Sequence, residues 1–399
     1  MRFSRRDLVK AAAAAALLPL FPRTGFAGNW AAVEAEAKGQ TVYFNAWAGS
    51  EAINTYISWA AELLKARYGV TLEHVKIADT AEVVRRVRDE VSAAKVEGSA
   101  DLVWINGENF RAMKAEKLLF GPFANDLPNF KYVDTEGKPT TLVDFAEPTD
   151  GLEAPWGMAQ LTFFGDGAKI SAPPQSMNEL VAFAKANPGR VTYPAPPDFH
   201  GTTFVKQALY ESIRDPSLLP LPAESAEFDR ATAPLFDLLD SLHPHLWRQG
   251  QQFPQSQAQL KQMLADGELL LALTFNPNEP ANLIASGELP VSTVAWQHRA
   301  GTIGNTHFVA IPINSKATAG AQVVANFLLS PEAQGRKADL RTWGDPTVLA
   351  MPKLSAEEAG FFATSVVPGR VVEPAPALPE PHGSWVPLIE KVWLQSYGT

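Results

Sequence analysis

The alternation of apolar and polar residues along the chain predicts short strands and amphipathic helices that follow one another in turn. The first apolar run, Thr41–Phe44, has the length of a buried strand. A helical stripe of apolar residues follows it, and Ser50 is the expected N-cap of that helix. Two more strands, Val70–Ile77 and Asp101–Ile105, are separated by another amphipathic segment. This succession predicts a parallel sheet with right-handed crossovers.

A strand pattern at Ala154–Asp166 stands between two such groups of strands and helices. Trp156 and Gln160 fall on one face of this strand, and Pro155 fits only at its start. We interpret the segment as a crossover between two α/β lobes that acts as a hinge. The face with Trp156 and Gln160 is then expected to look into a cleft. An internal strand of one large domain is the alternative interpretation.

The second half of the chain repeats the alternation. Capping-box patterns predict helices that begin at Ser176 and Ser256. Strands are expected at Val191–Tyr193, Leu269–Phe275, Val291–Trp296 and Thr306–Ile313, the last as a return crossover, and helices at Phe204–Ser212, Ala319–Leu329 and Trp385–Tyr397. The predicted division is a first lobe at 28–153 with a returning segment at about 307–345, a hinge strand and second lobe at 154–306, and a helical, proline-rich C-terminal segment at 346–399 that packs on the lobes.

Composition narrows the classes of function. The chain has 399 residues, enough for two cores of ordinary size, and a net charge of −9. That charge argues against nucleic acid or an anionic membrane surface as a partner. The cysteine count is zero. Disulfides, thiolate metal sites, a cysteine nucleophile and a lipid-anchored cysteine are therefore excluded.

Residues 1–27 have the three parts of an export signal, namely a basic start, an apolar run and a small-residue end. The apolar run Ala11–Phe21 is shorter than the roughly 20 residues of a membrane span, so no stable membrane insertion is expected. Ser4–Lys10 resembles the twin-arginine export consensus, with an ordinary secretory signal as the alternative. Either signal places the mature protein outside the cytoplasm. Because it has no lipid anchor, we expect it in a periplasm.

Polar residues gather after the predicted strands, where open parallel sheets bind their ligands. Each residue alone also fits a cap, a turn or a core position, but the group of loops indicates a small-molecule site. The candidate ligand-binding residues are Asn45, Trp47, Ser50, Asn106, Glu108, Asn109, Trp156, Gln160, Asp198, His200, Thr202, Asn276, Asn278, Glu279, Trp296 and Asn305.

No cofactor and no metal is expected. The seven histidines are scattered, and His243 and His245 lack the helical spacing that places two imidazoles on one metal. The chain contains no nucleophile elbow, Walker loop or dinucleotide fingerprint. Carboxylates that face one another across a cleft keep one enzymatic alternative open, a secreted α/β hydrolase that acts on a small or carbohydrate substrate. A pure scaffold or adhesion module is a third class.

Several motifs resemble the solute-binding proteins of ABC importers, and most of all their YnjB-like branch, which lies near the thiamine, polyamine and iron binders. The motifs that carry the resemblance are Asn45–Ser50, Asp101–Asn106, Ala154–Gly157, Gly189–Gly201, Ala310–Ser315 and Asn326–Gln334. The resemblance implies an α/β, two-lobed type II periplasmic binding protein fold with a crossover-strand hinge. It also implies a monomer without enzymatic activity that delivers a small ligand to a permease in the inner membrane. Iron binders of this group use a late tyrosine pair, and the absence of Tyr-Tyr from this chain argues against ferric iron.

The residue types favour an organic cation as the ligand. Aromatic rings beside carboxylates suit a cation, at roughly 0.5 to 2 kcal/mol for each cation–π contact. The predicted helix starts at Ser50 and Thr202 would suit a phosphate or carboxylate. A thiamine-like cationic heteroaromatic compound, with or without phosphate, meets both conditions. A sugar stacked on tryptophan requires the same residue types and remains an alternative.

Overall fold

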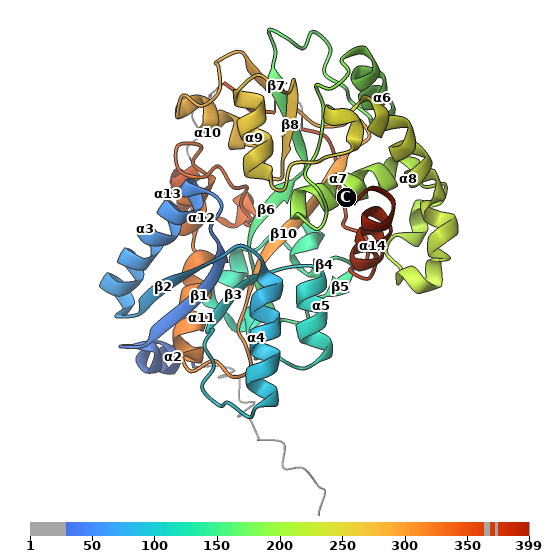
Figure 1. Cartoon of the computed structure of the whole chain (residues 1–399). Coiled ribbons are helices and arrows are strands. Elements are labelled where there is room, and N and C mark those ends of the chain that lie inside the picture. Colours follow the sequence, from blue (N-terminus) through green and yellow to red (C-terminus); the bar gives the residue numbers. More distant parts are fainter. Residues whose placement is uncertain (1–28, 363–367, 372–373, 399) are drawn as a thin grey trace, which may run out of the picture.

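The computed structural model describes residues 29–362, 368–371 and 374–398, which form two α/β lobes joined by long strands (Figure 1). The predicted export signal lies outside the described residues. The lower lobe in Figure 1 is built on a six-stranded sheet and the upper lobe on a three-stranded sheet. Within the described ranges, no helix has the length and apolar character needed to cross a membrane.

The lower sheet has the strand order β11-β10-β3-β1-β2, with β6 as a second partner of β10. As predicted, the first three strands are parallel, with β1 between the other two. Their bounds are β1 (Thr41–Trp47), β2 (Thr71–Ile77) and β3 (Leu102–Ile105). The helices of this lobe are α2 (Trp30–Ala37), α3 (Glu51–Tyr68), α4 (Thr80–Ser92), α5 (Glu108–Ala115), α11 (Thr318–Leu328) and α12 (Pro331–Ala338). Two hydrophobic clusters fill the lobe, one under α2, α3 and α11 and one under α4 and α5.

Two antiparallel strands, β6 (Glu153–Gln160) and β10 (Thr302–Ala310), connect the lobes. The expected crossover and its return are therefore present, although β10 begins four residues before the predicted Thr306. The crossover is interrupted at Leu161, whose backbone N–H donates to Ile303 across the strand pair. Beyond this break the chain continues as β7 (Thr162–Asp166), the central strand of the upper sheet, between β8 (Leu271–Thr274) and β9 (Thr293–Trp296).

The upper lobe surrounds its small sheet with helices. They are α6 (Met177–Ala186), α7 (Phe199–Ser212), α8 (Phe228–Leu242), α9 (Gln257–Ala265) and α10 (Glu279–Ala285). Ser176 and Ser256 cap α6 and α9 as predicted. Each serine hydroxyl accepts the backbone N–H of the residue three positions further along the chain. The predicted strand at Val191–Tyr193 is wrong. These residues are buried, but Pro194 follows them directly, and the Val191 carbonyl accepts the backbone N–H of Trp247, which begins a short 3-10 helix, instead of joining a sheet.

The C-terminal segment touches both lobes. Its short strand β11 (Ala377–Leu378) pairs with β10, and its helix α14 (Trp385–Tyr397) buries Trp385 and Trp393 in the upper core. Between them, the Gly383 N–H donates to the carbonyl of Phe145 in the lower lobe. Phe145 lies in the turn of a small hairpin, β4 (Val143–Asp144) and β5 (Glu147–Pro148). Before this segment, a short helix α13 (Ala356–Ala359) packs beside α12.

Candidate functional site

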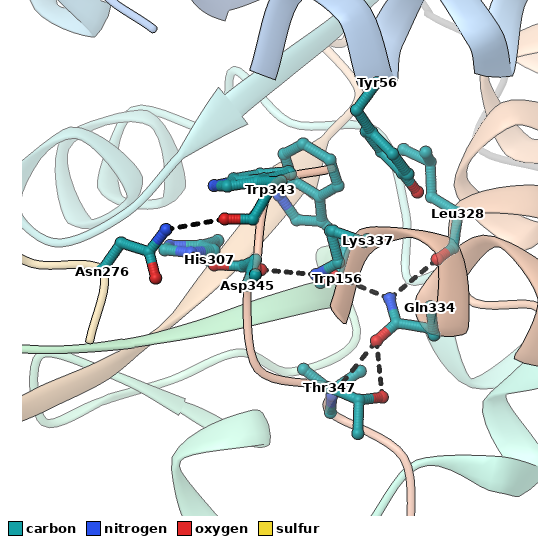
Figure 2. Close-up of polar contacts among 12 residues, drawn as sticks. Tyr56, Trp156, Asn276, His307, Leu328, Gln334, Lys337, Trp343, Asp345 and Thr347 are labelled. Atoms are coloured by element: carbon teal, nitrogen blue, oxygen red, sulfur yellow. Dashed lines mark hydrogen bonds and ion pairs between the residues drawn. The ribbon is translucent and has the colours of Figure 1, made fainter. Parts of the chain in front are cut away.

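Trp156 does not face a cleft, contrary to the prediction. Its side chain is fully buried in the lower lobe, with edge-on contacts to Trp104 and Trp343. Figure 2 shows it with Trp343. The reason is a shift in register, because Gly157 pairs with His307 while Pro155 pairs with Phe308, which leaves Trp156 as a bulge. A bulge breaks the alternation of faces on which the prediction depended.

Beside this ring lies a buried triad made of His307, Asp345 and Lys337 (Figure 2). The two oxygens of Asp345 accept from the imidazole at 2.8 Å and from the ammonium at 2.6 Å. Burial alone would raise the pKa of Asp345, but the Lys337 ammonium and the bond with His307 hold it below its ordinary value. The ammonium also donates to the backbone carbonyl of Trp156, so the triad ties the crossover strand to α12.

The segment that carries Asp345 reaches the upper lobe. Two residues predicted for the site, Asn276 and Asn278, donate their side-chain amides to the carbonyls of Trp343 at 3.0 Å and Gly344 at 2.6 Å. Asn282 donates to the Trp343 carbonyl as well, at 2.7 Å. These amides therefore join the lobes, which is a role that the prediction did not assign to them.

On another side of the crossover strands, Lys206 of α7 lies between the lobes with 1% of its side chain exposed. Its ammonium donates to Glu380 of the C-terminal segment at 2.6 Å, and it lies 4.6 Å from the ring centre of Phe145. The Asn305 amide nitrogen, on β10, donates to the other oxygen of Glu380 at 3.0 Å. Sequence reasoning missed Lys206 and Glu380, and only the unusual position of a lysine on the buried face of α7 hinted at the former.

Further carboxyls surround Lys206, and we name this set the acidic junction. Its members are Glu108, Asp144, Lys206, Glu380 and Glu390. The Glu108 side chain is exposed to solvent, although protein atoms lie around its carboxyl. Desolvation by these atoms, with the negative charges of Glu390 and Glu380, acts to raise the pKa of Glu108 against the opposing effect of Lys206. Burial also raises the pKa of Asp144, Glu380 and Glu390.

Comparison with known proteins identifies the family. A model of the bacterial extracellular solute-binding proteins matches residues 58–357. The chain belongs to this family. Protein YnjB of Escherichia coli (strain K12) is 48% identical over 384 residues, which cover 96% of this chain and 97% of that protein. The predicted resemblance to ABC-importer solute-binding proteins is confirmed, and nothing in these relationships supports the hydrolase alternative.

Solved structures confirm the fold. A periplasmic thiamin binding protein is similar with a TM-score of 0.60 at 16% identity, covering 90% of this chain and 95% of that one. The spermidine/putrescine substrate-binding protein PotD from Streptococcus pneumoniae has a TM-score of 0.60 at 14% identity, and the match covers 90% of this chain and 100% of PotD. AfuA from Actinobacillus pleuropneumoniae, with bound fructose-6-phosphate, has a TM-score of 0.61 at 14% identity, and the match covers 90% of this chain and 98% of AfuA. These chains share the two-lobed type II fold, and proteins of this kind deliver a small ligand to a membrane permease.

Three other predicted residues of the solute-binding protein, Asp198, His200 and Thr202, lie at the start of α7, and a fourth, Glu279, begins α10. Asp198 caps this helix and accepts the backbone N–H groups of His200 and Gly201. Burial lowers the pKa of His200, although Asp198 and Glu279 oppose this. Glu279, at the start of α10, accepts from Lys261 at 2.6 Å. Thr202, one turn into α7, donates to Glu390 of the acidic junction at 2.7 Å.

The remaining predicted residues serve the scaffold of the solute-binding protein or lie at its loop ends. Asn45 is buried and accepts from Arg86, so it belongs to the lower core. Trp296 is 6% exposed and donates to the Pro174 carbonyl, which corrects its prediction as a ligand-binding residue. Gln160 bonds to the C-terminal segment at Ala375 and Pro376. The Trp47 ring lies over Gly49, and Ser50 is the N-cap of α3 but makes no side-chain cap bond. Asn106 follows β3. The Asn109 amide nitrogen lies 3.5 Å from a carboxylate oxygen of Glu108.

Of the predicted residues, the structure brings Glu108, Thr202 and Asn305 to the acidic junction. It places Asn276 and Asn278 at the tie between the lobes. The described residues include no group of three or more histidines and carboxylates arranged to hold a metal ion.

Proposed function

We propose that this solute-binding protein captures a small organic cation at the acidic junction, between its lobes, and delivers it to a permease of the inner membrane. The observation that carries the proposal is the charge of the junction. Four carboxyls, those of Glu108, Asp144, Glu380 and Glu390, surround the single ammonium of Lys206. Burial raises the pKa of each carboxyl, and at Glu108 and Asp144 neighbouring carboxylates add to this effect, which the charge of a bound cation would offset.

An aromatic surface stands beside these charges. Phe199, the first residue of α7, is 38% exposed although it is a large apolar side chain, and the Lys206 ammonium lies 5.7 Å from its ring centre. An exposed ring next to carboxyls suits a flat cation, at roughly 0.5 to 2 kcal/mol for the contact. In this proposal Phe199 supplies the flat aromatic surface, because Trp156 and Trp296 are buried. A thiamine-like compound has the required charge and flat ring, and both the thiamin and the spermidine/putrescine binders share this fold.

The proposal includes the route to the periplasm and the mode of action. The export signal is of the twin-arginine type, the mature chain acts as a monomer, and it is not an enzyme. The lobes divide at 153/154 and 306/307, and they close on the ligand about β6 and β10. Support comes from the strand pair that links the two sheets and from the side-chain bonds between Asn276, Asn278 and the lower lobe.

Titration calorimetry with thiamine, its phosphates, spermidine, putrescine and maltodextrins tests the ligand class. We expect heat from cationic ligands and none from maltodextrins. A response to sugars alone would refute the cation. Small-angle scattering with the binding compound then tests closure, because a closing hinge lowers the radius of gyration. Mass spectrometry of material carried through gentle purification identifies the natural ligand.

A further inference from the structure

We propose that Phe145, at the tip of the hairpin formed by β4 and β5, stabilises the closed arrangement of the two lobes by contacts between protein groups alone. We name its contacts with Lys206 and Gly383 the lobe latch. This inference rests on the closure of the lobes that the proposed function includes. It is independent of the identity of the ligand, because the ligand takes no part in these contacts.

The tip of the hairpin has an unusual backbone conformation for its residues. Asp144 pairs with Glu147, so the turn between them consists of Phe145 and Ala146, whose φ angles are 44° and 64°. A two-residue turn with two positive φ angles is of type I′, which favours Asn and Gly. A bulky aromatic residue in the left-handed region costs conformational free energy. Such strain persists only where the surrounding contacts hold the residue in place, which directs the search to the contacts of Phe145.

The base of the hairpin is fixed to the lower lobe. One oxygen of Asp144 accepts the backbone N–H of Gly107, directly before α5, at 2.7 Å. Lys114, near the end of α5, donates to Glu147 at 2.6 Å. The Phe145 ring lies so close to Gly107 that a Cβ built on this glycine would clash with the ring. The hairpin therefore moves with the lower lobe.

The first partner of Phe145 belongs to the upper lobe. The Lys206 ammonium, on α7, lies 4.6 Å from the centre of the Phe145 ring, which is within the range of a cation–π contact. Glu380 fixes the position of this ammonium by accepting from it at 2.6 Å. The side chain of Lys206 is 1% exposed and Phe145 is 4% exposed, so the contact is shielded from water, which strengthens it. Figure 1 shows the hairpin between α5 and α7.

The second partner, Gly383, is held by the upper lobe as well. Its backbone N–H donates to the Phe145 carbonyl at 3.1 Å. Directly before it, the backbone N–H of His382 donates to the Leu219 carbonyl at 2.7 Å. Leu219 and Trp385, which lie on either side of this short segment in space and in sequence, are both buried in the upper core. The ring and the carbonyl of Phe145 therefore contact two separate parts of the upper lobe.

Opening of the lobes about β6 and β10 would separate the Phe145 ring from the ammonium, because the hairpin and α7 belong to different lobes. The latch therefore favours closure before a ligand arrives. A cation–π contact of this kind changes the ratio of closed to open protein by a factor of about 2 to 30. A ligand that contacts both lobes binds the closed form, so loss of the latch lowers its apparent affinity by no more than that factor.

The experiment measures the ratio of closed to open protein after refolding from urea, which removes any bound compound. The chain contains no cysteine, so Glu62→Cys on α3 and Lys185→Cys on α6 supply one exposed labelling site on each lobe. Distances between spin labels at these sites give the populations of the two forms. Phe145→Leu keeps an apolar side chain but removes the aromatic ring, and should lower the ratio by a factor of about 2 to 30. The matched control Ala146→Gly relaxes the turn, keeps the ring and the carbonyl, and should leave the ratio unchanged.

A second variant keeps the shape of the ring. Replacement of Phe145 by a difluorinated phenylalanine withdraws negative charge from the face of the ring, so it should lower the ratio in the same direction as Phe145→Leu, but by less. An unchanged ratio in both variants overturns the latch, as does an equal fall in Ala146→Gly. If Phe145→Leu does not fold, as judged by its thermal transition, the fluorinated variant decides.

Calorimetry with thiamine and spermidine separates this inference from the proposed function. If a probe binds the parent protein, its affinity should fall in Phe145→Leu by no more than the measured change in the ratio. A larger fall would show that Phe145 contacts the ligand itself, which contradicts a latch made of protein groups alone. Failure of both probes to bind, together with the expected fall in the ratio, overturns the proposed cation site and leaves the latch intact.

Discussion

Lys337 offers the sharpest test of how the crossover strand is held. Its side chain is 0% exposed, and its ammonium donates to Asp345 and to the Trp156 carbonyl. Lys337→Met keeps the length of the side chain but leaves the Asp345 carboxylate buried with the His307 imidazole as its remaining side-chain partner. Breaking a buried ion pair in this way costs about 3–5 kcal/mol. For a chain of 399 residues, an unfolding entropy of about 2.1 cal/mol/K per residue converts this loss to a fall in Tm of about 4–6 °C.

Two variants make the test specific. In Lys337→Met with Asp345→Asn, the lost cation is matched by a lost anion, and we expect at least half of the stability to return, since the penalty comes from the uncompensated charge. Lys169→Met breaks an ion pair at 3.7 Å in which the lysine side chain is 55% exposed, and should cost less than about 1 kcal/mol. The assay is urea unfolding followed by circular dichroism, with midpoints compared at equal slope. The reasoning fails if Lys337→Met costs no more than Lys169→Met, or if the double variant is as unstable as the single one.

Three further predictions test other parts of the molecule. In Gly157→Ala, the added Cβ would clash with the Asp345 carboxylate. The resulting shift of the strand should lower the free energy of unfolding by about 1–3 kcal/mol. A urea midpoint equal to that of the parent protein would show that the strand has room for the methyl group. Asn278→Ala removes the 2.6 Å bond to Gly344 and should weaken the tie between the lobes by about 1 kcal/mol, visible as a larger radius of gyration in solution scattering, whereas an unchanged radius would contradict a tie. For Glu211, burial would raise the pKa, but the bond to His298 holds the pKa below its ordinary value. The carboxylate therefore stabilises the fold above the unfolded pKa of about 4.3, and this stabilisation is lost as the pH falls through the folded pKa. Glu211→Gln should therefore destabilise the protein at pH 7 and much less at pH 3. An equal loss at both pH values, measured by urea unfolding, would exclude this contribution of the Glu211 carboxylate.

The sequence by itself determined the order of the elements and the class of fold. Apolar periodicity located β1, β2, β3 and both connecting strands, because a buried face leaves its period in the residues that form it. Capping residues such as Ser176 and Ser256 marked helix starts, since a cap acts within a few residues of itself. The wrong prediction at Val191–Tyr193 shows the limit of such local patterns, because an apolar run indicates burial but does not supply a neighbouring strand to pair with.

Only the tertiary structure decided which polar residues meet. The bulge at Trp156 turns that ring into the lower core, and a register shift of one residue is invisible in an alternating pattern. The acidic junction joins Glu108, Lys206 and Glu380, which are far apart in the chain and come from three different elements. Capping and periodicity are local effects, carried by neighbours in the sequence. Charge pairing between lobes depends on distances that exist only after the crossover strands have brought the two sheets together.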